Sequence, residues 1–261
     1  MPPARAALYA STAGILALAV RAGLGHPPPL GWAVLVLAGY VALLLAGVLV
    51  LRLRVFVDAV VRGPAGARGV ALTFDDGPDP RWTPKVLECL AKRGVVATFF
   101  VIGRKAERHP DVVRAILAAG HGIGLHAHDH DRLFSLRSER RVRADLERGI
   151  AALEKVSGQR PVLFRPPIGH TNPAIGRVAD DLGLAVVGWT VAGRDGLAGA
   201  RPEDVVTRVR RELRDRVIVL LHDAAERGDR EPAAVRALPA ILDAIAAERL
   251  DVVPVAQWVQ K

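Results

Sequence analysis

The sequence has very little cysteine, lysine or aromatic residue content. Cys89 is the only thiol in 261 residues, which excludes a disulfide within the chain and leaves the redox compartment open. Lysine is scarce beside arginine, so arginine supplies most of the net charge of +9. No aromatic residues interleave with this basic charge, and we therefore expect no nucleic-acid partner. Attraction to anionic membrane lipid is the more economical use of the charge.

One long run lacks charged residues altogether. Residues 30–51 would span roughly 33 Å as a helix, about the hydrocarbon thickness of a bilayer, and we predict a transmembrane helix there. The shorter apolar segment 6–20 is predicted as a second span, although a signal-peptide core or an interfacial helix also fits its length. The prolines at 27–29 would then connect a helical hairpin. We expect residues 1–55 to form a membrane anchor and 56–69 a linker.

Arginines flank the long apolar run unequally. The segment after it carries Arg52, Arg54, Arg62 and Arg68, whereas the connection before it carries Arg21 and the N-terminus carries Arg5. The positive-inside rule places the C-terminal part in the cytoplasm. Because that part is rich in arginine throughout, the rule discriminates weakly here. We predict an integral protein of the cell membrane, with the side of its C-terminal domain left open.

From Val70 onward, short β-rich runs alternate with amphipathic helical stretches. Strands are predicted at residues 70–74, 95–102, 122–125, 162–164, 184–191, 217–221 and 251–255, and helices near 84–93, 110–119, 138–156, 173–182, 202–213 and 232–248. Thr83 and Asn172, each before a proline, are predicted helix N-caps. The alternation indicates an α/β fold with a parallel sheet, closed or nearly closed into a barrel, over residues 70–261.

Two adjacent carboxylates, Asp75 and Asp76, follow the first predicted strand and precede a Gly-Pro turn. One carboxylate could bind a cation while the other takes a proton from water. Alone, the pair would more simply be a turn stabilised by Asx hydrogen bonds. The polar residues after the other strands favour the first interpretation, because chemistry in such barrels gathers at the carboxyl ends of strands.

A dense histidine cluster, residues 126–130, follows the third predicted strand. His126 and His130 could converge on one ion if the segment coils, and Asp76 would complete a three-ligand site open to water. His128 lies off that spacing and is expected to be near the ligands or simply exposed. The pattern predicts metal binding.

Further polar residues follow the later strands. Arg165 precedes a stiff Pro-Pro turn that would direct its guanidinium into the site, where it could hold an aspartate ionised. The alternative is a pairing with a surface carboxylate. Asp195 alone is only a loop acid. His222, at the end of the sixth predicted strand, could protonate a departing amine.

Together these residues resemble the polysaccharide deacetylases of the NodB-homology type, carbohydrate esterase family four. The resemblance runs from about Val70 to Val255 and covers five short motifs in the family's order, beginning with TFDDGP at residues 73–78. It implies a distorted (β/α)7 barrel and a divalent metal, most often zinc, although other first-row metals would serve. It assigns Asp76, His126 and His130 as metal ligands and Asp75 as catalytic base.

The later motifs supply the remaining roles by the same resemblance. Arg165 would support the base, and the backbone N–H of Ile168 would help hold the oxyanion. Asp195 would tune His222, the general acid, while Leu220 would line the acetyl pocket.

Three positions depart from the family's usual pattern. Ala127 stands where Ser or Thr is usual, Ile168 where an aromatic is common, and Gly196 where a Trp often follows the acid. Because those aromatic positions shape the groove for long sugar chains, the departures suggest a different or smaller acceptor, such as a lipid-linked sugar.

The sequence therefore predicts a membrane-anchored, metal-dependent hydrolase that removes the N-acetyl group of an amino sugar in a polysaccharide or glycolipid. Three alternatives stay open. They are a deformylase or deacetylase of a lipid-linked amino sugar at the cytoplasmic leaflet, an inactive sugar-binding module, and a membrane scaffold without metal. The sugar, the acyl group and the oligomeric state are not predicted.

Overall fold

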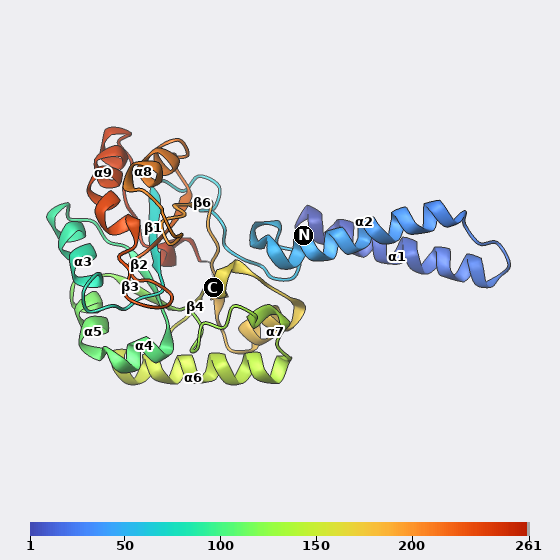
Figure 1. Ribbon diagram of the computed structural model, residues 1–261, viewed down its shortest axis with the longest axis horizontal. Coiled ribbons are helices and arrows are strands. Elements are labelled where there is room, and N and C mark those ends of the chain that lie inside the picture. The colour runs from blue at the N-terminus through green and yellow to red at the C-terminus, as the bar shows by residue number, and fades with distance from the viewer. Residues whose placement is uncertain (260–261) are drawn as a thin grey trace.

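The computed structural model describes residues 1–259 and consists of a helical hairpin joined to an α/β head (Figure 1). The hairpin contains α1 (Pro3–Gly23) and α2 (Leu30–Leu49), both long and apolar enough to cross a bilayer by length and composition. The helices run antiparallel, and Thr12 Oγ1 lies 3.1 Å from the Tyr40 hydroxyl between them. The N-terminus and the head therefore lie at the same end of the hairpin.

The chain between hairpin and head stays in contact with the head. After the 3₁₀ turn η1 (Leu51–Leu53), the side chains of Val55, Val57 and Ala59 are buried, and Val60 forms a parallel bridge with Val187. At least the first part of the segment predicted as a linker is thus packed against the domain. The hairpin is consequently attached over a short and well-packed path.

The head is built on one parallel sheet of seven strands. They are β1 (Val70–Asp75), β2 (Thr98–Val101), β3 (Gly122–Leu125), β4 (Leu163–Phe164), β5 (Ala185–Val186), β6 (Val191–Ala192) and β7 (Val217–His222), in the order β5-β4-β3-β2-β1-β7-β6. The helices are α3 (Thr83–Lys92), α4 (Gly103–Arg108), α5 (Pro110–Ala118), α6 (Glu139–Ser157), α7 (Pro173–Asp181), α8 (Pro202–Arg210) and α9 (Ala233–Ala247). The predicted parallel α/β fold is confirmed as a curled, incompletely closed barrel.

Two of the seven predicted strands were wrong in detail. The segment 184–191 forms β5 and β6 at opposite edges of the sheet, because the carbonyls of Val187 and Gly188 accept hydrogen bonds from the Arg165 side chain rather than from a strand. Residues 251–255 contribute only a bridge between Val252 and Val70 before the 3₁₀ turn η4 (Val255–Trp258). The connection between β5 and β6 therefore crosses the open side of the barrel.

One of the two predicted helix N-caps is confirmed. Asn172 caps α7, since its Oδ1 accepts a hydrogen bond from the Ile175 amide at 2.7 Å. Thr83 is not an N-cap: it is the first residue of α3, and its hydroxyl donates to the buried carboxylate of Asp223. The Thr83 hydroxyl thus binds a carboxylate distant in sequence and does not cap its own helix.

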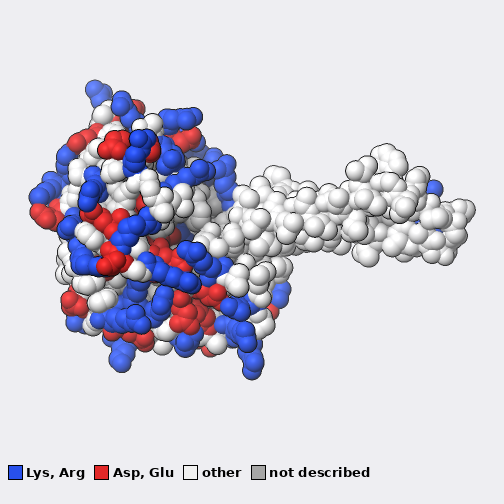
Figure 2. Space-filling view, in the orientation of Figure 1, with Lys and Arg blue, Asp and Glu red and all other residues white. Residues whose placement is uncertain are grey.

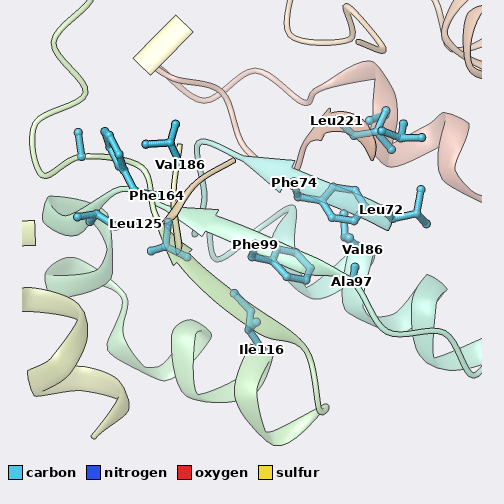
Figure 3. Packing of buried hydrophobic residues seen from close by; sticks show 14 of the residues in the cluster. Leu72, Phe74, Val86, Ala97, Phe99, Ile116, Leu125, Phe164, Val186 and Leu221 are labelled. Carbon is cyan, nitrogen blue, oxygen red and sulfur yellow. The ribbon is translucent and has the colours of Figure 1, made fainter. Parts of the chain in front are cut away.

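Aromatic and aliphatic side chains fill the space between the sheet and its helices (Figure 3). Phe74 of β1 and Phe99 of β2 stack with ring centroids 5.0 Å apart, and both are almost fully buried. Burying such side chains contributes roughly 1.5–3 kcal/mol each before opposing terms. This packing consequently holds the carboxyl ends of β1 and β2 in fixed positions.

Candidate active site

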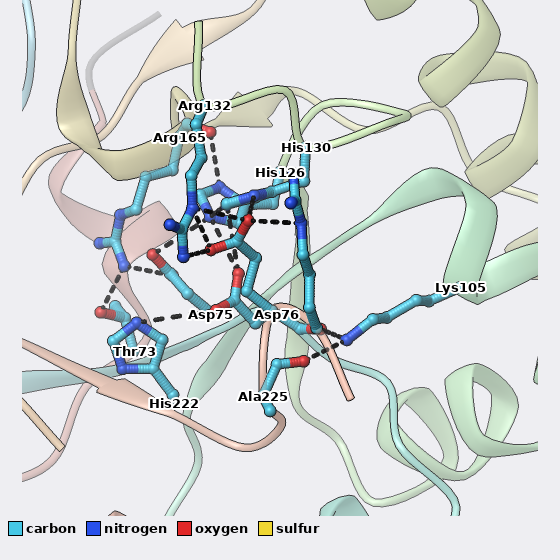
Figure 4. Close-up of polar contacts among 12 residues, drawn as sticks. Thr73, Asp75, Asp76, Lys105, His126, His130, Arg132, Arg165, His222 and Ala225 are labelled. Atoms are coloured by element: carbon cyan, nitrogen blue, oxygen red, sulfur yellow. Dashed lines mark hydrogen bonds and ion pairs between the residues drawn. The ribbon is translucent and has the colours of Figure 1, made fainter. Parts of the chain in front are cut away.

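The predicted polar residues meet at the carboxyl edge of the sheet (Figure 4). The register places Asp75, the last residue of β1, beside His222, the last residue of β7. His126 directly follows β3, and Arg165 directly follows β4. Parallel strands end at one edge, so segments far apart in sequence deliver their side chains to one place.

Asp76, His126 and His130 form a compact ligand group. Asp76 Oδ1 lies 3.5 Å from His126 Nε2 and 3.3 Å from His130 Nε2, and the two imidazole nitrogens are 3.1 Å apart. Asp76 and His130 have positive φ values of 72° and 51°, as does Ala127 at 59°. The backbone turns at these residues bring His126 and His130 toward the Asp76 carboxylate. The segment therefore coils, as the predicted convergence of the two histidines required.

The donor atoms of this group suit a divalent cation. His126 Nδ1 is 2.8 Å from the Arg165 carbonyl oxygen, which fixes the tautomer and leaves the Nε2 lone pair facing Asp76. Burial lowers the pKa of both His126 and His130 to about 3, so both imidazoles stay neutral as ligands must. Burial raises the pKa of Asp76 to about 7, with Asp75 adding to the rise, and Asp76 Oδ1 has no hydrogen-bond partner. A cation would satisfy all three atoms.

Asp75 lies next to the ligand group and is paired with a buried arginine. Arg165 Nη1 donates to Asp75 Oδ1 at 2.7 Å and to Thr73 Oγ1 at 2.9 Å, while its guanidinium stacks on the Phe100 ring. Burial raises the pKa of the Asp75 carboxyl, and the Arg165 charge opposes that rise. Asp75 is thus a carboxylate with a fixed orientation and an increased affinity for a proton.

His222 faces the same carboxylates from the opposite strand. Its Nδ1 is 3.1 Å from Asp195 Oδ1, and its backbone N–H donates to Asp195 Oδ2 at 2.8 Å. Although burial opposes it, the Asp195, Asp76 and Asp75 carboxylates raise the pKa of His222 to about 10. At neutral pH the imidazole is therefore protonated and able to donate a proton.

A pocket of about 550 Å³ opens over these groups, with Ile168 and Leu220 in its wall. Ile168 lies in the 3₁₀ turn η3 (Pro167–Gly169) with φ of 50°, and its side chain is 43% exposed. Gly169 sits so close to Trp189 that a Cβ there would be 2.3 Å from the ring. The turn is thus pressed against Trp189, which holds the backbone around Ile168 at the edge of the pocket.

The end of the hairpin contacts the same turn. Thr171 N–H donates to the Val48 carbonyl at 3.0 Å, and Thr171 Oγ1 donates to the Gly47 carbonyl at 3.2 Å. The last four carbonyls of a helix lack partners within it, so Thr171 caps α2 from the head. The segment that forms the pocket wall at η3 is therefore attached, through Thr171, to the end of α2.

Several residues of the site were missed from the sequence. Lys105 Nζ donates to the backbone carbonyls of Asp76 and Ala225 at 2.7 Å each, which ties the first-motif turn to the loop after β7. The carboxylate of Asp223 fills the space beside Gly77, where a Cβ would be 2.3 Å from Asp223 Oδ2. Neither contact has a local sequence signal, because each depends on two loops meeting.

His128 has a different environment from its neighbours. It is buried, its Nδ1 is 2.8 Å from Asp129 Oδ1, and its backbone N–H donates to Asp145 Oδ1. His128 is therefore neither simply exposed nor one of the three converging ligands. Its contacts hold the histidine loop on α6.

Comparisons with known proteins agree with this geometry. Residues 62–187 match the family model described as polysaccharide deacetylase. The chain is 38% identical over 181 residues to a peptidoglycan-N-acetylglucosamine deacetylase of Bacillus cereus, covering 69% of this chain and 82% of that protein. It is 37% identical over 155 residues to a chitooligosaccharide deacetylase of Azorhizobium caulinodans, covering 59% and 73%.

Solved structures show the same fold. A crystal structure of a peptidoglycan N-acetylglucosamine deacetylase superposes with a TM-score of 0.72 at 29% identity, covering 77% of this chain and 92% of that one. The fold, the motif residues at one sheet edge and the extent of the sequence match lead to one conclusion. The chain belongs to the polysaccharide deacetylase family, the NodB-homology hydrolases that cleave carbon–nitrogen bonds of N-acetylated amino sugars.

Proposed function

We propose that this protein is a membrane-anchored, metal-dependent deacetylase that removes the acetyl group from N-acetylglucosamine residues of a glycan. The observation that carries the proposal is the convergence of Asp76, His126 and His130 beside Asp75 and His222 in a single pocket. The names of the relatives support N-acetylglucosamine as the sugar. Each side chain has a role that follows from its contacts.

Asp76, His126 and His130 would hold the metal, and zinc suits one carboxylate and two neutral imidazoles best. When bound, a divalent ion polarises water and the amide carbonyl and makes the water more acidic. The Arg165 carbonyl orients His126 for this task. Another first-row divalent metal would fit the same donors.

Asp75 acts as the base. Its carboxylate takes a proton from the attacking water, whose oxygen forms a new bond to the amide carbon. Arg165 favours the ionised form of Asp75 and holds the carboxylate in place through the 2.7 Å contact. The raised pKa that burial gives Asp75 increases its ability to accept the proton.

The tetrahedral intermediate then needs stabilisation and a proton for its leaving group. The backbone N–H of Ile168 would donate to the oxyanion, and Leu220 would contact the acetyl methyl group. His222, held by Asp195, protonates the amine nitrogen as the carbon–nitrogen bond breaks. The products are acetate and a free amino sugar.

The hairpin supports membrane anchoring. Figure 2 shows it almost free of charged side chains, whereas blue and red groups cover the head. Because both its ends lie at the head, Arg5 would lie on the same side of a membrane as Arg52 and Arg54. This distribution favours the cytoplasmic side, while cell-wall glycans as substrates would require the opposite side.

A second candidate function is the deacylation of a lipid-linked amino sugar at the cytoplasmic leaflet. The contact of α2 with Thr171 supports it, because a hairpin that spans a membrane would hold the turn beside the pocket wall close to the membrane surface. A reporter fused to the C-terminus, active on one side only, would discriminate between the two sides.

Acetate release from an N-acetylated glycan by the full chain tests the proposal. We expect a stoichiometric divalent metal in the purified protein and a product lighter by one acetyl group in mass spectrometry. Asp76→Asn should lose both metal and acetate release, while Asp204→Asn, which changes an exposed carboxylate on α8, should keep both. A full-chain protein that releases no acetate when loaded with metal would refute the proposal.

A further inference from the structure

Four arginines line the pocket that holds the catalytic groups. They come from three separate loops and are Arg132, Arg194, Arg227 and Arg230. The proposed reaction uses none of them, since the base, the acid and the metal ligands are all other residues. A neutral acetamido group needs no cation from the protein beyond the metal and the acid.

The charges of the pocket do not balance without a further anion. Asp75 and Asp76 would be neutralised by a divalent metal, which leaves Glu226 as the only acidic residue among those lining the pocket. Four arginines thus outnumber the one remaining carboxylate among the lining residues, and two of them, Arg132 and Arg227, contact it. The remaining excess of positive charge attracts an anionic ligand in a partly enclosed site.

Two of the four arginines, Arg132 and Arg230, are held in place by hydrogen bonds. Arg132 binds Glu226 through two nitrogens, at 2.8 and 2.6 Å, and Figure 4 shows it reaching over the ligand group. Arg230 donates to the carbonyls of Gly196 and Leu197. Fixed arginines lose less conformational freedom when they bind a planar or tetrahedral anion.

Arg194 is the least explained of the four. It precedes Asp195, has an unfavourable positive φ of 58°, is exposed, and forms no ion pair within residues 1–259. Arg227 contacts only the edge of Glu226, at 3.4 Å, and its side chain is 71% exposed. Arg194 thus has no acidic partner among residues 1–259, and Arg227 has one long contact, so both guanidinium groups are accessible to a substrate.

The pocket offers little to a neutral glycan. Long neutral sugar chains are commonly held by stacking on aromatic faces, and Trp189 is the only Trp, Tyr or Phe in the lining. Trp189 is itself pressed against Gly169. Gly196 leaves no side chain where an aromatic could stand, and Arg230 binds its carbonyl instead.

We infer that the substrate carries an anionic group, a carboxylate or a phosphate, close to the N-acetylated sugar, and that Arg194 and Arg227 bind it. This inference rests on the proposed deacetylation and names the class of its substrate. A carboxylate would come from an acidic glycan, and a phosphate from a sugar linked to a lipid carrier. Both would be selected over an uncharged chito-oligosaccharide.

Matched substrates test the inference with the full chain in nanodiscs of zwitterionic lipid. One pair is an N-acetylated tetrasaccharide bearing free carboxylates and its methyl ester; the other is N-acetylglucosamine 1-phosphate and the methyl glycoside. We expect kcat/KM to favour the charged member by about tenfold, and the ratio to fall as salt rises from about 50 to about 500 mM because salt screens the attraction. Preference for the phosphate identifies a lipid-linked source, and preference for the carboxylate an acidic glycan.

Variants identify the residues responsible. Arg194→Gln and Arg227→Gln should each reduce the charged-to-neutral ratio by about two- to fivefold, as expected for exposed ion pairs. Arg194→Lys should retain part of the ratio. Arg114→Gln, an exposed arginine on α5 away from the pocket, should leave the ratio unchanged.

Binding measured without turnover separates this inference from the proposed function. Calorimetry should show tighter binding of N-acetylglucosamine 1-phosphate than of the methyl glycoside, with the difference lost in the Arg194→Gln, Arg227→Gln double variant. Equal affinity, or equal kcat/KM within each pair in an active enzyme, would overturn the inference and leave the deacetylase intact. Preferential binding of the anion by a protein that releases no acetate would support the subsite and refute the reaction.

Discussion

The hairpin exposes most of its apolar side chains, whereas the head buries them. Leu37 and Leu45 of α2 are more than half exposed, whereas Leu72 and Phe74 of β1 are fully buried. Apolar surface in contact with water is unfavourable in proportion to its area, so the head is stabilised by its own core while the hairpin needs another apolar environment. By length and composition both helices are able to cross a bilayer, which would supply that environment.

The two regions nevertheless meet through specific contacts. Leu51, just after α2, is buried in the core of the head and packs near Gly188. Thr171 caps the carbonyls of α2 two residues after the turn that carries Ile168 and Gly169. Two roles fit these contacts: the hairpin either only tethers the head or also holds the pocket wall.

The largest effect is expected inside the head, at the proposed base Asp75. Asp75→Asn should keep the metal, because Asp76 and the two histidines are unchanged, but should reduce acetate release by about 10³-fold or more, since the variant cannot accept the proton. Metal content by mass spectrometry and a kinetic assay measure the two properties separately. Full activity in the metal-loaded variant would exclude Asp75 as the base.

A smaller effect is expected at the acid and would appear in the pH profile. The Asp195 carboxylate helps raise the pKa of His222 to about 10, so the proton is available below that pH and activity declines as pH rises through it. Asp195→Asn should move the decline toward lower pH and reduce kcat at pH 8 by about 10- to 100-fold. Asp204→Asn, an exposed acid paired with Arg201, is the matched control. An unchanged alkaline limb would mean that another group sets it.

The convergence of the predicted site residues could be inferred from the sequence, because their motifs lie where strands end. Once Asp75 and His222 are assigned to parallel strands, the fold itself brings them to one edge. Lys105 and the break at Gly188 could not be predicted in this way. The first depends on two loops meeting over its ammonium group, and the second on the Arg165 side chain occupying the carbonyls that a continued strand would use.

The smallest effect is expected at the junction itself. Thr171→Val removes the hydroxyl that donates to the Gly47 carbonyl but retains the backbone hydrogen bond to Val48. Losing one buried hydrogen bond should lower the free energy of unfolding by about 1 kcal/mol. If the hairpin also holds the pocket wall, KM for a soluble substrate should rise by about two- to fivefold, with kcat nearly unchanged, because the bond that is lost supports the turn carrying Ile168.

Thr207→Val is the matched control for this junction variant, because the Thr207 hydroxyl bonds only its own helix, α8, at an exposed position. It should change neither stability nor KM appreciably. A Thr171→Val protein that loses stability but keeps its KM would show that the hairpin is a tether alone. A rise in KM confined to Thr171→Val would show that the end of the anchor belongs to the support of the active site, so that hairpin and head act as one unit.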